Sequence, residues 1–438
     1  MRYLFFYALA LSVFKIYGQI ENTDISLTPR QIESVFLERN LGLIAEKMNV
    51  SVADAEIIQA KLWDNPSFSI NDLNLWSTGA QRDGETIPPL FGSFGRNMQF
   101  SVELSQIINL SGKRGKRVAM QKVSRDMALT RSKQLLKCLK LELRKSIAEL
   151  IYNQSYKNIL LKQRESLESI VTAYKKQYYN GNISKSDMLR LQSAQYQLDN
   201  EINIINTELN GLQKTMRNLL CIQSTGDIRV TPEEINFPQP MTISLESLIN
   251  HASESHPDII LQRQQTGYYK KSEKYEKSLR VPDLNISVGY DRRGGVWRDF
   301  IGFGIGIDIP VFNRNQGAIK AAEIYTRQSE VLAVQQENAI RNELAEAYNN
   351  YINTYHMYEK SSKDNFSEEM DGMLGVFTKN MIDRNISIVE YMDFFGSYLS
   401  SKNIVLTVRK EMSLRYEELQ YAAGTEINSK TQIDEQSK

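Results

Sequence analysis

The chain carries an internal duplication, which constrains its fold more than any other feature. Two sets of residues recur in the same order in the second half. One set is separated by 203 positions: Ile183 and Ile386, Ser184 and Ser387, Asp187 and Glu390, Met188 and Tyr391. The other is separated by 216 positions: Leu27 and Ile243, Asn40 and His256, Leu43 and Ile259, Ile44 and Ile260, Pro66 and Pro282. A repeat of about 200 residues is too long for a solenoid unit, so each half should contain the same series of elements.

The distribution of proline predicts two very long helices. All ten prolines lie between residues 29 and 89 or between residues 232 and 310. Because proline breaks helix interiors, its absence elsewhere permits long helices at about 113–180 and 318–383. At 1.5 Å per residue, each of these helices would be roughly 100 Å long.

Shorter helical segments should pack beside the long ones. We expect them at about 184–221, 387–422, 28–64 and 244–280, each about half the length of a long helix. Two half-length segments placed end to end would match one long helix, which leaves the polar linker at about 222–243 around the middle of the bundle. A stripe of tyrosines with helical spacing is expected to be a packed seam and not a ligand track. The stripe is Tyr348, Tyr351, Tyr355 and Tyr358.

Four segments alternate apolar residues with polar or small ones. They lie at about 66–76, 98–107, 283–291 and 300–309. The first changes phase after Ile70, which indicates a β-bulge. Alternation over about ten residues is what a transmembrane β-strand with a wet lumen requires. A soluble, half-buried sheet gives the same pattern, so both interpretations stay open.

The number of strands bears on the membrane interpretation. A sheet in lipid must close into a barrel, because lipid cannot satisfy the hydrogen bonds of an open edge. Four strands are too few to close one. Three chains would together supply about 12 strands, an even number that suits an antiparallel barrel. The membrane interpretation therefore predicts a homotrimer.

The composition argues against several classes of protein. A formal net charge of +1 gives no basic footprint, so no nucleic-acid partner is expected. The mean hydropathy of −0.41, with no apolar run of 18 residues after residue 20, excludes a helical transporter. No nucleophile elbow, phosphate loop or zinc motif occurs, so neither an enzyme nor a cofactor is expected. The three histidines lack the spacing of a metal site.

Residues 1–18 have the pattern of a secretory signal peptide. Arg2 precedes an apolar run of 12 residues, and Gly18 supplies a small residue for cleavage. The run is too short to span a bilayer, so export is expected. No cysteine lies near that site, so lipidation is not expected. The only two cysteines, Cys138 and Cys221, could pair in an oxidising compartment.

Three local motifs resemble one family. Asn65–Ser69 (NPSFS) resembles the start of its first strand, and Leu104–Gln106 leading to Gly112–Gly115 resembles a junction between a strand and a long helix. Asp308–Gly317 (DIPVFNRNQG) resembles the second such junction. Over about residues 27–424 the chain is similar to the TolC-type outer-membrane efflux factors. The last motif most resembles the heavy-metal-efflux, CzcC-like branch.

The resemblance implies an α+β membrane protein and a passive function. Three internally duplicated chains would form a 12-stranded transmembrane β-barrel, embedded in outer-membrane lipid and continued by a long α-helical periplasmic tunnel. This homotrimer would be the exit duct of a tripartite efflux pump, fed by a periplasmic adaptor and an inner-membrane transporter of the RND type. Metal cations are the implied cargo. The alternatives are multidrug efflux or type I polypeptide secretion and, more remotely, a periplasmic coiled-coil binding protein.

The reversals between long and returning helices would form the periplasmic end. The resemblance implies that these tips, and the grooves beside them, contact the adaptor. The tip residues are Gly181, Asn182, Ile183, Ser184, Arg384, Asn385, Ile386 and Ser387. Glycine and asparagine are also what any helix reversal needs, and the two roles are compatible.

The two tips differ in charge. Asp187 and Arg190 form an opposite-charge pair in the first half, whereas Glu390 and Asp393 carry like charges at the same positions in the second. By resemblance, these acidic positions match those that ring the closed tunnel entrance in TolC. A trimer would gather six carboxylates there and favour cations. A solvated helix face is the simpler interpretation.

Two further regions carry expectations. Gly372 and Gly375 replace Ser169 and Thr172 of the first half, so they are a candidate hinge for opening the second hairpin. The duplicated unit is expected to span residues 19–424. The polar residues 425–438 are expected to be a disordered tail.

Overall fold

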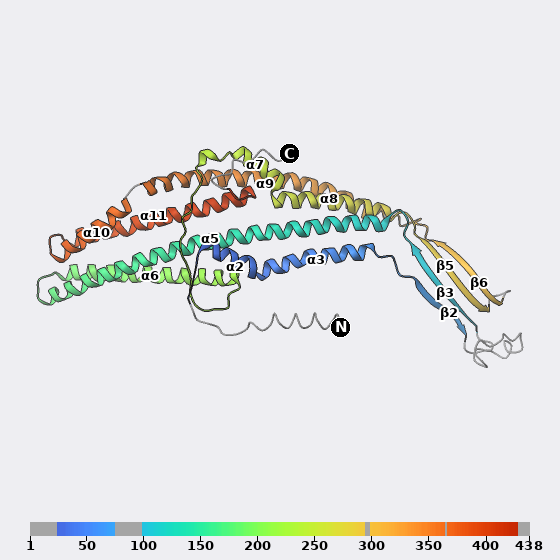
Figure 1. The fold of residues 1–438 in the computed structure, drawn as a ribbon, viewed down its shortest axis with the longest axis horizontal. Coiled ribbons are helices and arrows are strands. Elements are labelled where there is room, and N and C mark those ends of the chain that lie inside the picture. The colour runs from blue at the N-terminus through green and yellow to red at the C-terminus, as the bar shows by residue number, and fades with distance from the viewer. Residues whose placement is uncertain (1–23, 75–98, 294–297, 364–365, 428–438) are drawn as a thin grey trace. The chain divides into compact units, whose positions relative to one another are not determined.

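The computed structural model describes residues 24–74, 99–293, 298–363 and 366–427 (Figure 1). The expected signal peptide lies outside the described residues. Contacts divide the chain into two compact units. The helical unit comprises Met1–Glu46, Ser132–Ile259 and Glu337–Lys438, and the sheet unit comprises Lys47–Arg131 and Ile260–Gln336.

The described elements follow the order expected of two repeats. The first half contains β1 (Ile25–Leu27), α2 (Pro29–Arg39), α3 (Leu41–Lys61), β2 (Ser67–Asn74), β3 (Gln99–Ile108), α5 (Lys113–Tyr179) and α6 (Lys185–Leu220). The linker contains β4 (Ile228–Val230) and the short 3-10 helix η2 (Pro240–Thr242). The second half contains α7 (Leu245–Ser255), α8 (Pro257–Ser278), β5 (Leu284–Arg293), β6 (Arg298–Ile307), α9 (Gln316–Lys363), α10 (Phe366–Ile382) and α11 (Ile388–Ala423).

The long helices follow the proline argument in both halves. α5 is one uninterrupted helix of 67 residues. The region expected to be helical at 318–383 is helical as α9 and α10. Residues 364 and 365, between them, lie outside the described residues.

The half-length segments at 184–221 and 387–422 are single helices, α6 and α11, as expected. The two segments that precede the strands need a correction, because each is two helices and not one. The segment at 28–64 is divided at Asn40, and the segment at 244–280 is divided at His256. Both residues have extended backbone angles and donate their N–H to the preceding helix. Pro257 explains the second break, since a residue before proline is disfavoured in the helical region. At the first break, the Asn40 side chain accepts the Leu43 N–H at 3.0 Å and so begins a new helix.

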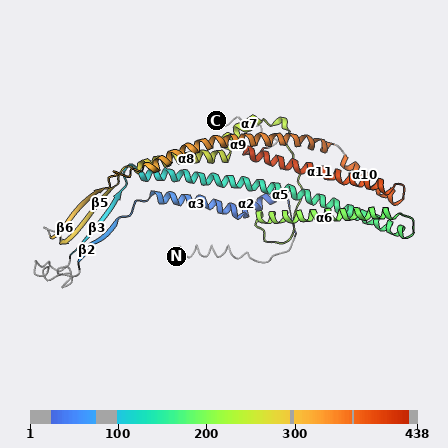
Figure 2. The ribbon, with the colours of Figure 1, turned by 180° about the vertical axis from the view of Figure 1, so that it is seen from behind.

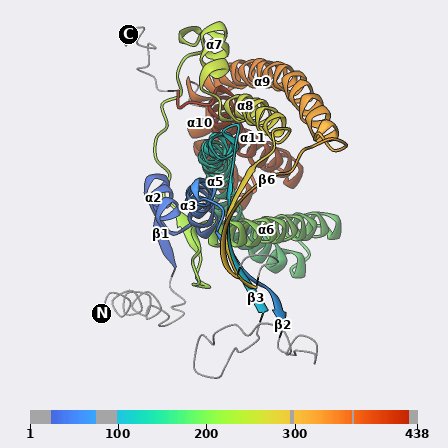
Figure 3. The same ribbon diagram turned by 90° about the vertical axis from the view of Figure 1, so that its right-hand side faces the viewer.

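The sheet unit contains a four-stranded antiparallel sheet in the order β2-β3-β5-β6 (Figure 1). Seen from the side in Figure 3, the strands follow one curved surface. A row of apolar residues crosses all four strands on one face: Phe68, Leu104, Val288 and Phe303. The adjacent row on the opposite face is Ser67, Ser105, Ser287 and Gly304. The apolar face is exposed in the single chain, with Phe303 85% and Phe68 66% accessible.

The predicted bulge is confirmed in β2. The pairing with β3 shifts between Asn71 and Asn74, and Asp72 has a φ of +54°. One extra residue in this strand therefore accounts for the change of phase after Ile70.

The linker packs on the tyrosine stripe. Tyr351 is fully buried and donates a hydrogen bond of 2.5 Å to the Pro238 carbonyl, and Tyr348 donates one of 3.0 Å to the Ile243 carbonyl. Phe237 lies edge-on to Tyr358 with ring centroids 5.2 Å apart. The stripe is thus a packed seam, as predicted.

Two features of the helical unit were not expected. β1 and β4 pair in parallel, from Ile25 opposite Ile228 to Leu27 opposite Val230. The residues just after Gly424 are also not a free tail, because the Ile427 N–H donates to the Gln420 side chain at 3.0 Å and Ile427 is buried. The start of the expected disordered tail at residue 425 is therefore wrong by a few residues.

Two further observations concern the membrane and the cysteines. None of the helices in the described ranges is long and apolar enough to cross a membrane. Cys138 is exposed, Cys221 is partly exposed, and both are free thiols. The pairing left open by the sequence is therefore not formed.

Candidate functional site: the two hairpin tips

Two helical hairpins in the helical unit carry the predicted site residues. In each, the two helices lie side by side, α5 with α6 and α10 with α11 (Figures 1 and 2). The two hairpins share one hydrophobic core. Its buried members include Leu160, Leu167, Tyr174, Leu191, Leu198, Met381, Tyr391 and Phe395. Because the core draws on all four helices, the two tips belong to one packed body.

The first tip ends α5 with a Schellman motif. The Asn182 N–H donates to the Gln177 carbonyl at 3.0 Å, and the Gly181 N–H donates to the Tyr178 carbonyl at 3.0 Å. Gly181 has a φ of +74°, which glycine adopts without a steric cost. The sequence at this tip therefore matches what the reversal needs.

The second tip makes the same motif with a less suitable residue. The Asn385 N–H donates to the Asn380 carbonyl at 2.8 Å, and the Arg384 N–H donates to the Met381 carbonyl at 3.2 Å. Arg384 takes the place of Gly181, with a φ of +61°. A side chain in this region is strained by roughly 1–2 kcal/mol, so Arg384 is kept at some cost in stability.

A serine begins each returning helix. The Ser184 hydroxyl accepts the Asp187 N–H at 3.1 Å, and the Ser387 hydroxyl accepts the Glu390 N–H at 3.2 Å. Ile183 and Ile386 are half-buried and pack against the shared core. Of the eight predicted tip residues, the remaining six are exposed. The exposed outer surface is the part that a partner can contact.

A buried tyrosine ties the two hairpins together near their tips. The Tyr174 hydroxyl of α5 donates a hydrogen bond of 3.0 Å to the Met381 carbonyl of α10. Burial raises the pKa of Tyr174, with opposing influences from Arg384 of the second tip and Asp187 of the first. No local pattern in the sequence predicts this contact, because its partners lie more than 200 positions apart.

The predicted gate residues Glu390 and Asp393 are both exposed. Glu390 has a local role, since its Oε2 atom accepts hydrogen bonds of 2.8 Å from the N–H and the hydroxyl of Ser387. These bonds hold the pKa of Glu390 below its usual value of 4.5, so the carboxylate stays charged at neutral pH. Ser387 and Glu390 form a capping box, a pattern that was readable in the sequence.

The opposite-charge pair expected in the first half needs a correction. Asp187 and Arg190 form no ion pair within 4.0 Å, although both lie in the described part of the chain. Instead, the Asp187 carboxylate accepts the Ser184 hydroxyl at 2.7 Å. The Asp187 carboxylate is therefore engaged at the start of α6 and not with Arg190, three residues further on.

The candidate hinge glycines lie in exposed turns of α10. A Cβ atom added to Gly372 or Gly375 would meet no atom within 4 Å. Packing therefore does not require glycine at either position. Each lowers the local stability of the helix by roughly 0.5–1 kcal/mol relative to alanine.

A groove of about 530 Å³ lies beside the second tip, between α5 and the second hairpin. Its lining includes Lys162, Ser166, Asp371, Gly375 and Lys379. Asp371 belongs to a network that the sequence did not reveal. Its carboxylate accepts the Tyr398 hydroxyl at 2.8 Å and the buried Lys402 ammonium at 2.6 Å. Burial, followed by the bond to Asp371, raises the pKa of Tyr398.

Metal chemistry finds no support in the described part of the chain. No group of three or more histidine, cysteine, aspartate or glutamate side chains there has the arrangement of a metal site. The predicted site is a surface with exposed carboxylates and an adjoining groove.

Comparison with known proteins was made by sequence and by fold. No protein-family model and no curated protein matches the sequence. The fold matches the CmeC outer-membrane channel of Campylobacter jejuni, with a TM-score of 0.73, 12% identity, and coverage of 95% of this chain and 91% of that one. The chain has the fold of the outer-membrane channel proteins.

Other solved structures give the same result. CusC, described in terms of transmembrane channel formation, matches with a TM-score of 0.70 and 15% identity, over 94% of this chain and 96% of that one. The outer-membrane protein VceC of Vibrio cholerae matches with a TM-score of 0.68 and 14% identity, over 91% and 96%. Each of these matches shows a shared fold over most of the chain.

Proposed function

We propose that three copies of this chain form an outer-membrane exit duct of a tripartite efflux pump. The observation that carries this proposal is the exposed apolar face of the sheet, on a chain whose fold matches outer-membrane channels. Large apolar side chains such as Phe303, Ile305 and Phe68 are more than half exposed, which suits contact with lipid. The opposite face carries serine and glycine, which suit a wet lumen.

The edges of the sheet support assembly. β2 and β6 are the two outer strands, so each has one side without a partner strand in the single chain. Pairing β6 of one copy with β2 of the next would remove both edges and close a barrel of about 12 strands.

Two helices of the sheet unit also expose apolar side chains that suit a subunit interface. On α3 they are Met48, Val52 and Ile58, and on α9 they are Tyr325, Val331 and Val334, each at least half exposed. Heterologous contacts of this kind generate closed rings. These surfaces therefore favour a homotrimer over a monomer.

The hairpin tips are the proposed contact for a periplasmic adaptor. The exposed residues of both tips, with the groove lined by Asp371 and Lys379, would receive a helical hairpin of the partner. The groove presents both charged and apolar side chains, as interfaces with helical partners do. An RND transporter in the inner membrane would deliver the cargo to this end.

The entrance gate is proposed at Glu390 and Asp393. Both are exposed on the same tip, and Glu390 stays charged because Ser387 stabilises the carboxylate. In a trimer these residues would surround the axis and attract cations. Gly372 and Gly375 would let α10 bend during opening.

Metal cations are the proposed cargo. This choice rests on the resemblance of Asp308–Gly317 to the heavy-metal branch and on the acidic tip, which favours cations. Multidrug efflux or polypeptide secretion is the second candidate, because a duct without chemistry can serve several pumps. A periplasmic coiled-coil protein is the remote alternative, and the exposed apolar sheet disfavours it.

The test is fractionation followed by complementation. The full chain should enter the outer-membrane fraction and run as a trimer, and deletion of its gene should raise sensitivity to cobalt, zinc or copper. A chain recovered as a soluble periplasmic protein would refute the duct. If the chain is an outer-membrane trimer but its deletion raises sensitivity only to dyes or drugs, the proposed duct is supported and the metal cargo is refuted.

A further inference from the structure

The two halves of the chain contain the same joint, and it lies in the helical unit. In the first half, Asn40 separates α2 from α3 and its amide donates 2.8 Å to the Leu219 carbonyl, near the end of α6. In the second half, His256 separates α7 from α8 and packs on Gly424, at the end of α11. The joints are equivalent: α6 ends at Cys221 and α11 at Gly424, each in a left-handed conformation.

The contact between His256 and Gly424 is tight. A Cβ atom added to Gly424 would lie 2.9 Å from the His256 ring, and Gly424 has a φ of +70°. His256 is only 2% exposed. The imidazole is therefore enclosed between the α7–α8 junction and the end of α11, with no room for a larger neighbour.

The hydrogen bonds of His256 determine where a proton would bind. Its Nδ1 atom accepts the Asp258 N–H at 3.3 Å, which caps α8. The neutral ring must then carry its proton on Nε2. Nε2 is buried without a hydrogen-bond partner among the described residues. The Tyr421 backbone acts on the ring in the direction that raises the pKa of His256. Added acid would protonate Nδ1, the atom that caps the helix.

We propose that His256 is a proton-sensitive joint, at which protonation of Nδ1 uncaps α8 and loosens the end of α11. A protonated Nδ1 is a donor and would face the Asp258 N–H, another donor. Asn40 makes the equivalent cap with an amide oxygen, which does not titrate in this range. The second half is therefore sensitive to acid where the first half is not.

The charges around His256 act in both directions. Lys137 of α5 opposes a positive charge on the ring, whereas Asp258 of α8 favours one. Tyr421 of α11 and Glu343 of α9 lie near Asp258 and complete the titratable surroundings, together with the exposed Cys138 of α5. Burial is the largest influence and holds the pKa of His256 below its usual value of 6.5.

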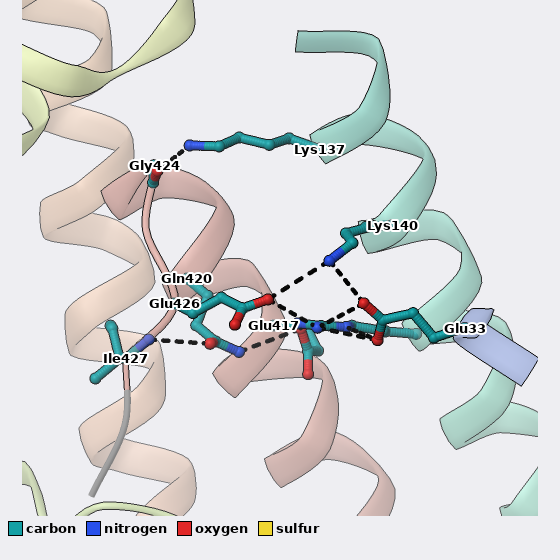
Figure 4. Close-up of polar contacts among 9 residues, drawn as sticks. Glu33, Lys137, Lys140, Glu417, Gln420, Gly424, Glu426 and Ile427 are labelled. Carbon is teal, nitrogen blue, oxygen red and sulfur yellow. Dashed lines mark hydrogen bonds and ion pairs between the residues drawn. The ribbon is translucent and has the colours of Figure 1, made fainter. Parts of the chain in front are cut away.

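Gly424, which packs on His256, begins the segment from Gly424 to Ile427 that is drawn in Figure 4. Lys137 donates to the Gly424 carbonyl, and Glu426 pairs with Arg144 at 3.1 Å and Lys140 at 3.6 Å. These bonds link the end of α11 to α5 of the first half. If the end of α11 loosened at His256, the hydrogen bond and ion pairs that join residues 424–426 to α5 would therefore be weakened.

The sign of the effect follows from the lowered pKa. The loosened state, with an ordinary histidine, binds a proton more readily than the closed state does. The closed joint is fully stable above the ordinary pKa and loses stability as the pH falls below it. One proton can change the opening equilibrium by at most about tenfold per pH unit.

The test is hydrogen exchange of the assembled, detergent-solubilised chain between pH 7.5 and pH 5, with rates corrected for intrinsic exchange. Peptides covering residues 256–260 and 419–427 should exchange faster as the pH falls, by up to about tenfold per unit below about pH 6.5. In His256→Asn, which installs the residue of the first half, these peptides should show no such acid response. The peptide covering residues 38–44 should be insensitive to pH in both proteins.

Two further measurements keep the proposal falsifiable if His256→Asn fails to fold. Exchange at the histidine ring carbon reports the pKa of His256, which should be below its usual value of 6.5. In Asp258→Asn, the acid response should begin at the same pH but become larger and extend to lower pH, because loss of the negative charge lowers the pKa of His256 further in the closed joint. A wild-type chain without an acid response at 419–427, or a His256 pKa at or above 6.5, would overturn the proposal.

Discussion

Glu390 is bonded to Ser387, because its Oε2 atom accepts the Ser387 N–H and the Ser387 hydroxyl, each at 2.8 Å. The capping box uses one carboxylate of the proposed gate to begin α11, while Asp393 has no such local role. A substitution at Glu390 therefore changes both the capping of α11 and the charge of the proposed gate. A substitution at Asp393 changes the charge alone.

The first prediction concerns ion selectivity. Asp393→Asn should lower the preference for cations over anions roughly twofold or more, because a trimer would lose half of its six proposed gate carboxylates. Glu390→Gln should act similarly without loss of the helix start, since glutamine also completes a capping box. Reversal potentials of the purified channel in a salt gradient measure this. An unchanged potential in Asp393→Asn would remove that residue from the gate.

The same measurement has a pH dependence with a defined sign. Ser387 lowers the pKa of Glu390, so the charge is present at neutral pH and is lost only as the pH falls through the lowered pKa. Selectivity should therefore persist from pH 7 to about pH 5. Selectivity that disappeared above pH 5 would assign it to another group.

The second prediction concerns the candidate hinge. Changing both Gly372 and Gly375 to alanine should stabilise α10 by roughly 1–2 kcal/mol, since neither added Cβ meets an atom. If α10 must bend for the duct to open, transport should fall while the trimer stays intact. Efflux by cells expressing the double variant measures this, with Ser169→Ala in the first hairpin as the control. Unchanged transport would reject the hinge.

The third prediction compares the two reversals. Arg384→Gly should stabilise the second tip by about 1 kcal/mol, because glycine tolerates the left-handed conformation. Gly181→Ala, the opposite change at the equivalent position, should destabilise the first tip by about the same amount. Thermal unfolding of the purified protein tests both. If Arg384→Gly were destabilising, contacts of the arginine would outweigh its backbone strain.

The fourth prediction concerns the charge cluster drawn in Figure 4. Arg144 pairs with Glu417 at 3.0 Å, and with Glu33 and Glu426 at 3.1 Å each. Arg144→Met would leave Glu33 and Glu426 paired with Lys140 and would leave Glu417 without its ion-pair partner. It should cost about 2 kcal/mol, less than for a fully buried pair because the cluster is partly exposed.

Arg30→Met is the matched control for that change. Arg30 also pairs with a glutamate, Glu233 at 3.6 Å, but its side chain is 91% exposed. Its loss should change stability by less than about 0.5 kcal/mol. Denaturant unfolding compares the two variants, and equal effects would show that burial does not distinguish them.

Much of the fold could be predicted because periodicity and proline are local signals. The absence of proline predicted α5, and alternation predicted β3, β5 and β6 close to their observed positions. The break at His256 was readable from Pro257. The break at Asn40 was not predicted, because its cap on Leu43 is only a weak local signal and its other hydrogen bond reaches Leu219, 179 positions away.

The site was predicted less completely, for a related reason. The reversals at Gly181 and Arg384 follow from residue types and the repeat. The roles of Lys402 and Tyr174 depend on contacts between distant helices, and neither residue has a local signal. Ile427 looked like part of a polar tail, and only its packing beside Tyr416 and Gln420 reveals otherwise.

The central claim is that three chains close one barrel through β2 and β6. Cysteines at Ser67 or Ser69 on β2, each combined with a cysteine at Ile305, Gly306 or Ile307 on β6, test it directly in a background without Cys138 and Cys221. Oxidation in isolated outer membranes should convert at least one pair into a covalent species of three chains, with two chains as its intermediate. Monomers alone for every pair, or a ladder that continues beyond three chains, would contradict the account.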